Sequence, residues 1–119
     1  QRVGIKPQAD FSTFEHHKPM LSLANAFNDH DILSFHERII KNLQDAKELH
    51  YFCEPKMDGA AISLIYENGI LVRGVTRGDG SFGEDITSNI RTVKSIPLTL
   101  TKSVDPFPRL IEIRGEIFI

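Results

Sequence analysis

Lys56 is the residue in this chain whose type and surroundings most clearly suit covalent chemistry. It follows an apolar run, Tyr51-Phe52-Cys53, and lies two residues before Asp58-Gly59, a pair typical of a turn. An ionised amine is rarely buried without a partner, so a lysine at the end of a buried strand indicates a functional role. If its amine is a nucleophile, the chain carries a covalent intermediate during its reaction.

A glycine-rich segment, residues 77–84, is a second candidate for a functional site. Its glycines allow positive φ and a close approach of the backbone to a ligand. The segment lacks the Gly-Lys-Ser/Thr ending of a Walker loop, and no long helix follows it as in a dinucleotide-binding βαβ unit. A plain turn is therefore the default interpretation. Arg77 favours a functional role, because a cation at this position could meet a phosphate or a ribose.

Alternating charges mark the last segment of the chain. Glu112, Arg114 and Glu116 fall on one face of an extended chain, and isoleucines with Gly115 fall on the other. We favour a solvated sheet surface as the explanation of these charges. The alternative is that they form the wall of a polar pocket.

The elements that must position these residues follow from the hydrophobic pattern. Apolar residues recur at helical spacing and predict an amphipathic helix over residues 31–46, with N-cap candidates at 28–31. A short helix capped by Asp85 should reach Arg91 or Val93. The predicted strands are residues 51–55, 61–66, 70–76, 96–101 and 110–119, with a hairpin turn at 67–69, a loop at 105–108 and an irregular lead-in at 1–20. This order predicts an α+β fold with mostly antiparallel sheets and packed helices.

Composition limits the possible functions. The 119 residues suffice for one domain with a modest core, and no apolar run is as long as a membrane helix or a secretion signal. The single cysteine, Cys53, excludes an internal disulfide and fits a reducing compartment such as the cytoplasm. The net charge of −2 does not suggest that this domain binds DNA by its own electrostatics. The pair His16-His17 is interpreted as two surface histidines, and no metal ligands are assigned.

Four ordered blocks together resemble one enzyme family. Lys56-Met57-Asp58-Gly59 is similar to the K-x-D-G signature of covalent nucleotidyltransferases, which alone is a weak signal. The other blocks resemble those of bacterial NAD-dependent DNA ligases in order and spacing: Pro19–Leu23 with Asn25–Phe27, Thr76–Gly80 with Gly83–Asn89, and Arg114–Phe118. ATP-dependent ligases typically carry an arginine shortly after K-x-D-G, where this chain has Ala60-Ala61-Ile62.

The resemblance implies that residues 1–119 are the N-terminal part of an adenylation domain, with a lead-in at 1–20 and a core at 21–119. The expected fold is that of the nucleotidyltransferases (ATP-grasp-like DNA ligases), incomplete at the C-terminus. Lys56 would attack the α-phosphorus of NAD, release nicotinamide mononucleotide (NMN) and carry AMP. The AMP would then pass to a nick in duplex DNA during replication and repair.

The resemblance also implies roles for individual residues. Lys56 is the expected nucleophile, and Asp58 would support the phosphoryl chemistry or its Mg²⁺. The remaining expected contacts to the nucleotide are Ser22 and Leu23 on the NAD path, Glu54 at the adenine, Arg77 and Glu116 at the ribose, and Met57 and Gly59 within the signature. Arg77 and Mg²⁺ would favour the neutral amine, whereas Glu54 and Asp58 would favour the ammonium, and the sequence leaves this balance open.

Further expectations concern cofactors and partners. NAD is the expected co-substrate, Mg²⁺ the expected ion, and zinc is expected only in a C-terminal region beyond this chain. Nicked duplex DNA would be the partner of the longer enzyme, which is expected to be a monomer without membrane contact. The chain ends within a predicted strand, which suggests a fragment. The alternative hypothesis is therefore a truncated fragment that binds NAD or adenosine without ligation activity.

Overall fold

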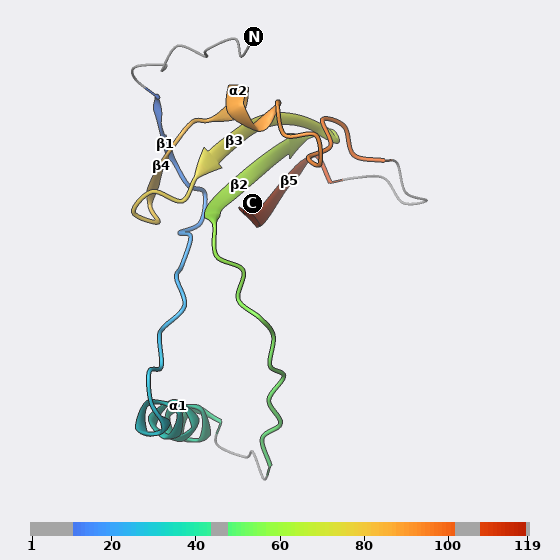
Figure 1. Ribbon diagram of the computed structural model, residues 1–119. Helices are drawn as coiled ribbons and strands as arrows, with labels where there is room; N and C mark the ends of the chain where they lie inside the picture. Colours follow the sequence, from blue (N-terminus) through green and yellow to red (C-terminus); the bar gives the residue numbers. More distant parts are fainter. Residues whose placement is uncertain (1–10, 44–47, 102–107, 119) are drawn as a thin grey trace. The chain divides into compact units, whose positions relative to one another are not determined.

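The computed structural model describes residues 11–43, 48–101 and 108–118 (Figure 1). The chain divides into two compact units. We call the first the sheet unit, which comprises the residues up to Leu21 together with those from Met57 onward. We call the second the helix unit, which comprises Ser22–Lys56.

The sheet unit is built on three antiparallel strands in the order β3-β2-β5 (Figure 1). These strands are β2 (Ala60–Glu67), β3 (Ile70–Thr76) and β5 (Leu110–Ile117). Asn68 and Gly69 join β2 to β3 with φ angles of 49° and 78°, which suits a two-residue hairpin turn. The predicted hairpin is thus confirmed, and so is the antiparallel α+β character of the chain.

One face of this sheet forms the core. Its buried side chains are Ile62, Leu64, Tyr66, Leu71 and Ile90. The last belongs to α2 (Thr87–Ile90), a helix shorter than expected, which packs on β3. A Cβ at Gly74 would lie 2.5 Å from Cγ1 of Ile90, so the glycine permits this close packing. Ile86 rather than Asp85 is the N-cap residue of α2, although the Asp85 carboxylate accepts a hydrogen bond from the Thr87 amide at 3.0 Å.

A second, two-stranded sheet was not predicted. β1 (Thr13–Glu15) pairs with β4 (Phe82–Glu84) in antiparallel register. β1 corrects the expectation of an irregular lead-in, and β4 lies inside the segment predicted to be a loop. The missed pair has a simple reason: both strands have three residues, too few for an alternating pattern to be recognisable. Residues 1–10 of the predicted lead-in lie outside the described residues.

The helix unit contains α1 (Asp29–Asn42), which begins two residues before the predicted start at 31. The Asn28 side chain accepts a hydrogen bond from the Asp31 amide at 2.9 Å, as an N-cap should. Leu43 caps the other end, and residues 44–46 of the predicted helix lie outside the described residues. None of the residues of α1, all of them described, is buried.

Two predicted strands are wrong. Residues 51–55 form no strand, and every residue from Tyr51 to Ala60 is exposed. An extended segment becomes a strand only when a neighbour pairs with its backbone, and no described residue forms such a ladder with residues 51–55. Residues 96–101 form only an isolated bridge, Ile70 with Thr99. Turns precede this bridge, and Pro97 has no amide hydrogen for a ladder.

The last strand is confirmed with a shorter end. β5 stops at Ile117, so Phe118 is not part of it, and Ile119 lies outside the described residues. Residues 105–107 of the predicted loop also lie outside them.

Candidate functional site

The residues expected to act on a nucleotide are divided between the two units. Those in the helix unit are Ser22, Leu23, Glu54 and Lys56; those in the sheet unit are Met57, Asp58, Gly59, Arg77 and Glu116. All of them are exposed except Glu116, which is half-buried. Because residues 51–58 are not a strand, strand alternation does not place Glu54, Lys56 and Asp58 on one face.

Arg77 and Glu116 are brought together by the register of the sheet. Glu116 pairs with Ala61, and the Arg77 amide donates to the Ala61 carbonyl at 3.1 Å, which extends the β2–β3 ladder by one residue. Residues paired across neighbouring strands share a face, so Arg77, Ala61 and Glu116 form one rung. Twice the strand spacing separates the two charged residues, about 10 Å between their Cα atoms. Ala61, the residue between them, carries only a methyl group.

Gly59 lies immediately before β2 and packs against the end of β5. A Cβ at Gly59 would lie 2.1 Å from the Ile117 carbonyl oxygen, so no side chain fits there. The sequence assigned this glycine to nucleotide contact, whereas the structure provides a packing reason for it. The close approach also fixes the start of β2 at Ala60, directly after Gly59.

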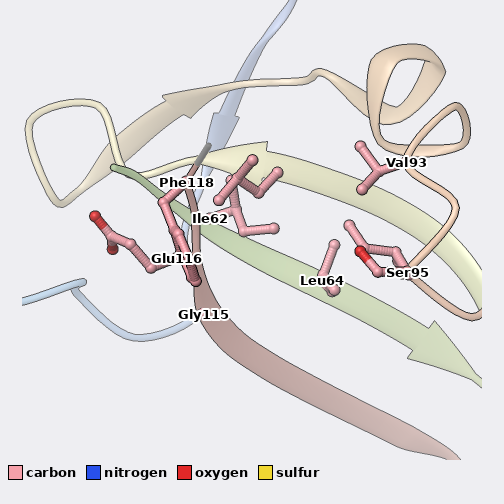
Figure 2. Close-up of a pocket in the computed structure, with 9 residues that line it drawn as sticks. Ile62, Leu64, Val93, Ser95, Gly115, Glu116 and Phe118 are labelled. Atoms are coloured by element: carbon pink, nitrogen blue, oxygen red, sulfur yellow. The ribbon is translucent and has the colours of Figure 1, made fainter. Parts of the chain in front are cut away.

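The opposite side of the same strands, together with residues 93–96, lines an open pocket of about 300 Å³ (Figure 2). Its lining is largely apolar: Ile62, Leu64, Val93, Ser95, Ile96, Gly115, Glu116, Ile117 and Phe118. In Figure 2 the Glu116 carboxylate points away from Val93 and Ser95. This side chain therefore lies on the other face of the sheet, which also carries Ala61, Glu112 and Arg114. We call this the polar face.

Glu112 and Arg114 on the polar face are not simply solvated, which corrects the favoured interpretation. Glu112 is half-buried and accepts hydrogen bonds from the buried Ser63 hydroxyl at 2.7 Å and from Arg114 Nε at 2.9 Å. Burial raises the pKa of Glu112, but these two hydrogen bonds and the Arg114 charge outweigh it and hold the pKa below its usual range. The Arg114 guanidinium also donates to the carbonyls of Lys18 and Pro19, so it fastens the lead-in segment to β5.

The first part of the glycine-rich segment, residues 77–81, forms a tight turn between β3 and β4. Gly78 and Gly80 have φ angles of 58° and 97°, as the sequence predicted for glycines in this segment. The Asp79 carboxylate accepts hydrogen bonds from the amides of Phe82 and Ser81, which lower its pKa. The turn is therefore closed by its own residues and holds Arg77 at its first position.

His16 is buried, although the sequence predicted a surface histidine. It was expected on the surface together with His17, and His17 is exposed, but His16 is only 7% exposed. Its Nε2 lies 3.0 Å from the Thr76 carbonyl oxygen and 3.1 Å from that of Arg77. The signal that could have identified it is its place directly after β1, but β1 itself was not predicted.

The helix unit contains an apolar pocket of about 710 Å³. Residues of α1 and the segment 51–53 line it: Ile32, Leu33, Phe35, His36, Tyr51, Phe52 and Cys53. The Tyr51 hydroxyl is hydrogen-bonded to His36 Nδ1 at 2.7 Å, and the rings of Phe35 and Tyr51 lie 6.2 Å apart. Tyr51, the first residue of the apolar run before the lysine motif, thus contacts α1, and the run forms no strand.

Within the described ranges, no three histidine, cysteine, aspartate or glutamate side chains gather in a way that could hold a metal ion. None of the helices in the same ranges has the length and apolar character needed to cross a membrane.

Comparison with known proteins yields one family. Residues 8–119 match the model of the NAD-dependent DNA ligase adenylation domain. A DNA ligase of Marinomonas sp. is 55% identical over 119 residues, and one of Hahella chejuensis is 54% identical over 121 residues. A DNA ligase of Cellvibrio japonicus is 50% identical over 119 residues. Each match covers 100% of this chain but only 17% of the relative, so the chain spans about a sixth of their length.

Proposed function

Because this chain belongs to the family of NAD-dependent DNA ligase adenylation domains, we propose that it is the part of a DNA ligase in which Lys56 takes AMP from NAD. The family match supports the use of NAD. The K-x-D-G motif at Lys56–Gly59 supports the choice of nucleophile, because it is the only stretch of the chain with this pattern. The rung formed by Arg77, Ala61 and Glu116 is the observation in the structure that supports the position of the nucleotide.

In the proposed reaction, the neutral amine of Lys56 attacks the α-phosphorus of NAD. A phosphorus–nitrogen bond forms, and the bond from that phosphorus to the bridging oxygen of the pyrophosphate breaks. NMN leaves with the electron pair, and the amine loses a proton. The 5′-phosphate of a nick then attacks the phosphorus of the lysine–AMP, the phosphorus–nitrogen bond breaks, and the Lys56 amine leaves with the electron pair and takes up a proton. The 3′-hydroxyl finally attacks the phosphorus of the 5′-phosphate, loses its proton and displaces AMP, which seals the strand.

The polar face of the sheet supports the roles proposed for its residues. Arg77 and Glu116 stand on either side of a small alanine, so a ribose between them could meet a donor on one side and an acceptor on the other. Glu54 would select the adenine, and Ser22 and Leu23 would line the path of NAD. Met57 and Gly59 would border the nucleotide from the motif itself.

Mg²⁺ would have to be held mainly by phosphate. The described residues offer no cluster of three or more metal-ligating side chains, so they do not fit an all-protein magnesium site. Mg²⁺ commonly keeps several waters and binds through one or two carboxylates plus substrate phosphates, and Asp58 is the carboxylate proposed here. Zinc remains a prediction for regions outside this chain.

A direct test is the mass of the protein after incubation with NAD and Mg²⁺. We expect the mass to increase by one AMP, and we expect Lys56→Ala to abolish the increase. Lys94→Ala is the matched control, because Lys94 is another exposed lysine outside the motif. Labelling of a residue other than Lys56, or an unchanged increase in Lys56→Ala, would refute the proposal.

A second function, binding of NAD or adenosine without ligation, is favoured by one observation. The chain covers only 17% of its relatives, so the 119 residues lack most of the polypeptide that those ligases contain. We expect that they do not seal nicks by themselves. Thermal stabilisation by NAD but not by ATP would support binding of the predicted nucleotide, and nick joining by the isolated chain would contradict this second function.

A further inference from the structure

His16 occupies a buried position between the two sheets of the sheet unit. Its amide donates to the Ser81 carbonyl at 2.9 Å, which continues the pairing of β1 with β4 by one residue. Gly83 of β4 makes room for the ring, since a Cβ there would lie 2.9 Å from His16 Nε2. The position of the imidazole is therefore determined by backbone on both sides.

The hydrogen bonds of His16 define which nitrogen carries the proton. Carbonyl oxygens only accept, so Nε2, which faces the carbonyls of Thr76 and Arg77, must be the donor. Nδ1 is buried and has no hydrogen-bond partner among the described residues. A buried polar atom without a partner destabilises a fold, so an apolar ring would pack here more favourably unless the Nε2–H bond had a use.

The structural role of the hydrogen bond from His16 Nε2 is seen at Arg77. The Arg77 amide donates to Ala61, and its carbonyl accepts from the Gly80 amide at 3.0 Å as well as from His16. The backbone of Arg77 is thus held by β2, by the glycine-rich turn and by the imidazole. These contacts fix the direction in which the Arg77 side chain leaves the chain, on the rung that it shares with Glu116.

We propose that His16 is a positioning residue for Arg77. It does not touch the nucleotide; it holds the peptide at the end of β3 so that the guanidinium is ready to meet NAD. This inference rests on the proposed function, in which Arg77 contacts the ribose. It goes beyond that function because it assigns a role in NAD binding to a buried histidine outside the four motif blocks.

The test measures how the rate of single-turnover adenylation depends on NAD concentration, in a full-length ligase that carries this domain. His16→Phe keeps the ring shape but cannot donate a hydrogen bond. We expect it to raise the half-saturating NAD concentration about 3- to 10-fold, the effect of losing one hydrogen bond. His16→Gln, whose amide can donate, should lose less. His17→Phe is the matched control and should change the value less than twofold.

A double-mutant cycle separates positioning from general stability. If His16 acts through Arg77, His16→Phe should have no further effect on half-saturation in an Arg77→Ala background. Equal effects of His16→Phe in both backgrounds, or no effect in the wild-type background, would overturn the proposal. If His16→Phe does not fold, the same cycle is run with His16→Gln. If Lys56 carries AMP and the effects of the His16 and Arg77 substitutions are additive, only the positioning role is refuted. If another residue carries AMP, the proposed function is refuted.

Discussion

The sheet unit and the helix unit use apolar residues in opposite ways. In the described part of the chain, all of the buried apolar side chains belong to the sheet unit, including Tyr66 and Val75. In the helix unit, α1 has an apolar face at helical spacing, yet its large side chains, such as Leu33 and Phe35, remain exposed. The same kind of pattern therefore produces a core in one region and an apolar surface in the other.

This difference shows which forces maintain each unit. In the sheet unit, hydrogen-bonded ladders hold three strands together, and burial of their apolar face adds the larger part of the stabilisation. In the helix unit, α1 depends on local terms: its cap, its hydrogen bonds and the contact of Tyr51 with His36. Isolated helices of this length are marginally stable in water, so these local terms matter more there.

The largest effect is expected in a comparison that makes the same substitution, leucine to alanine, once in each unit. Leu71 on β3 is 2% exposed, and Leu33 on α1 is 61% exposed. Leu71→Ala should lower the free energy of unfolding by about 2–5 kcal/mol, because it leaves a cavity in the core. Leu33→Ala should change it by less than about 0.5 kcal/mol. Denaturant unfolding followed by far-UV circular dichroism measures both, and similar losses would show that the contrast between the units is wrong.

A second comparison stays within the sheet unit and uses two glycines. A Cβ at Gly59 would lie 2.1 Å from the Ile117 carbonyl oxygen, whereas a Cβ at Gly115 would meet no atom within 4 Å. Gly59→Ala should therefore cost about 1–3 kcal/mol, the usual penalty for overpacking. Gly115→Ala should be neutral or stabilise by up to about 1 kcal/mol, because alanine suits a strand better than glycine.

Thermal unfolding in the absence of NAD distinguishes packing from nucleotide contact at Gly59. If Gly59→Ala unfolds at the wild-type temperature but binds NAD poorly, the glycine serves the nucleotide and the packing explanation fails. If both properties are lost together, the β5 contact accounts for the glycine in the motif.

The sequence predicted those elements whose pattern is local and long. The hairpin of β2 and β3, the helix α1 and the strand β5 all have repeating apolar positions and clear turn or cap residues. It failed for β1 and β4, which have three residues each, and for residues 51–55, where Tyr51 contacts α1 and no strand forms. Pairing between distant segments decides these cases, and single-sequence periodicity contains no information about the partner.

The candidate site shows the same limit. The motifs predicted roles for Lys56, Arg77 and Glu116 from their local sequences, but the shared rung of the last two follows from the register of β2 with its neighbours. The alternation correctly placed Glu112, Arg114 and Glu116 on one face of β5. The hydrogen bonds from Arg114 to the carbonyls of Lys18 and Pro19, almost a hundred residues away in sequence, could not be predicted from that alternation.

A third prediction concerns the local stability of the helix unit. The Asn28 side chain accepts from the Asp31 amide, and the Asp31 carboxylate accepts from the Phe27 amide at 2.9 Å. Asn28→Ala should destabilise α1 by about 0.5–2 kcal/mol, because an amide at its N-terminus loses its partner. Asn42→Ala, at the other end of the helix, is the control. Hydrogen exchange of the α1 amides should become faster in the first variant alone, while the β2 amides remain unchanged.

The smallest expected effect is a pH dependence confined to the sheet unit. Burial raises the pKa of Glu112, but the Ser63 and Arg114 hydrogen bonds outweigh it, so the pKa lies below its ordinary value of 4.5. A carboxyl group with a lowered pKa in the folded state contributes stability above its unfolded pKa and loses it as the pH falls through the folded pKa. Stability should therefore decrease below about pH 4.5, by less than about 1 kcal/mol from this partly exposed group. Glu112→Gln should be less stable at pH 7 but should lose less on acidification, whereas Glu37→Gln on α1 should behave like wild type. If the stability of all three proteins falls by the same amount on acidification at constant ionic strength, the proposed role of the Ser63–Glu112–Arg114 network is contradicted. Glu112 would then add nothing that protonation removes.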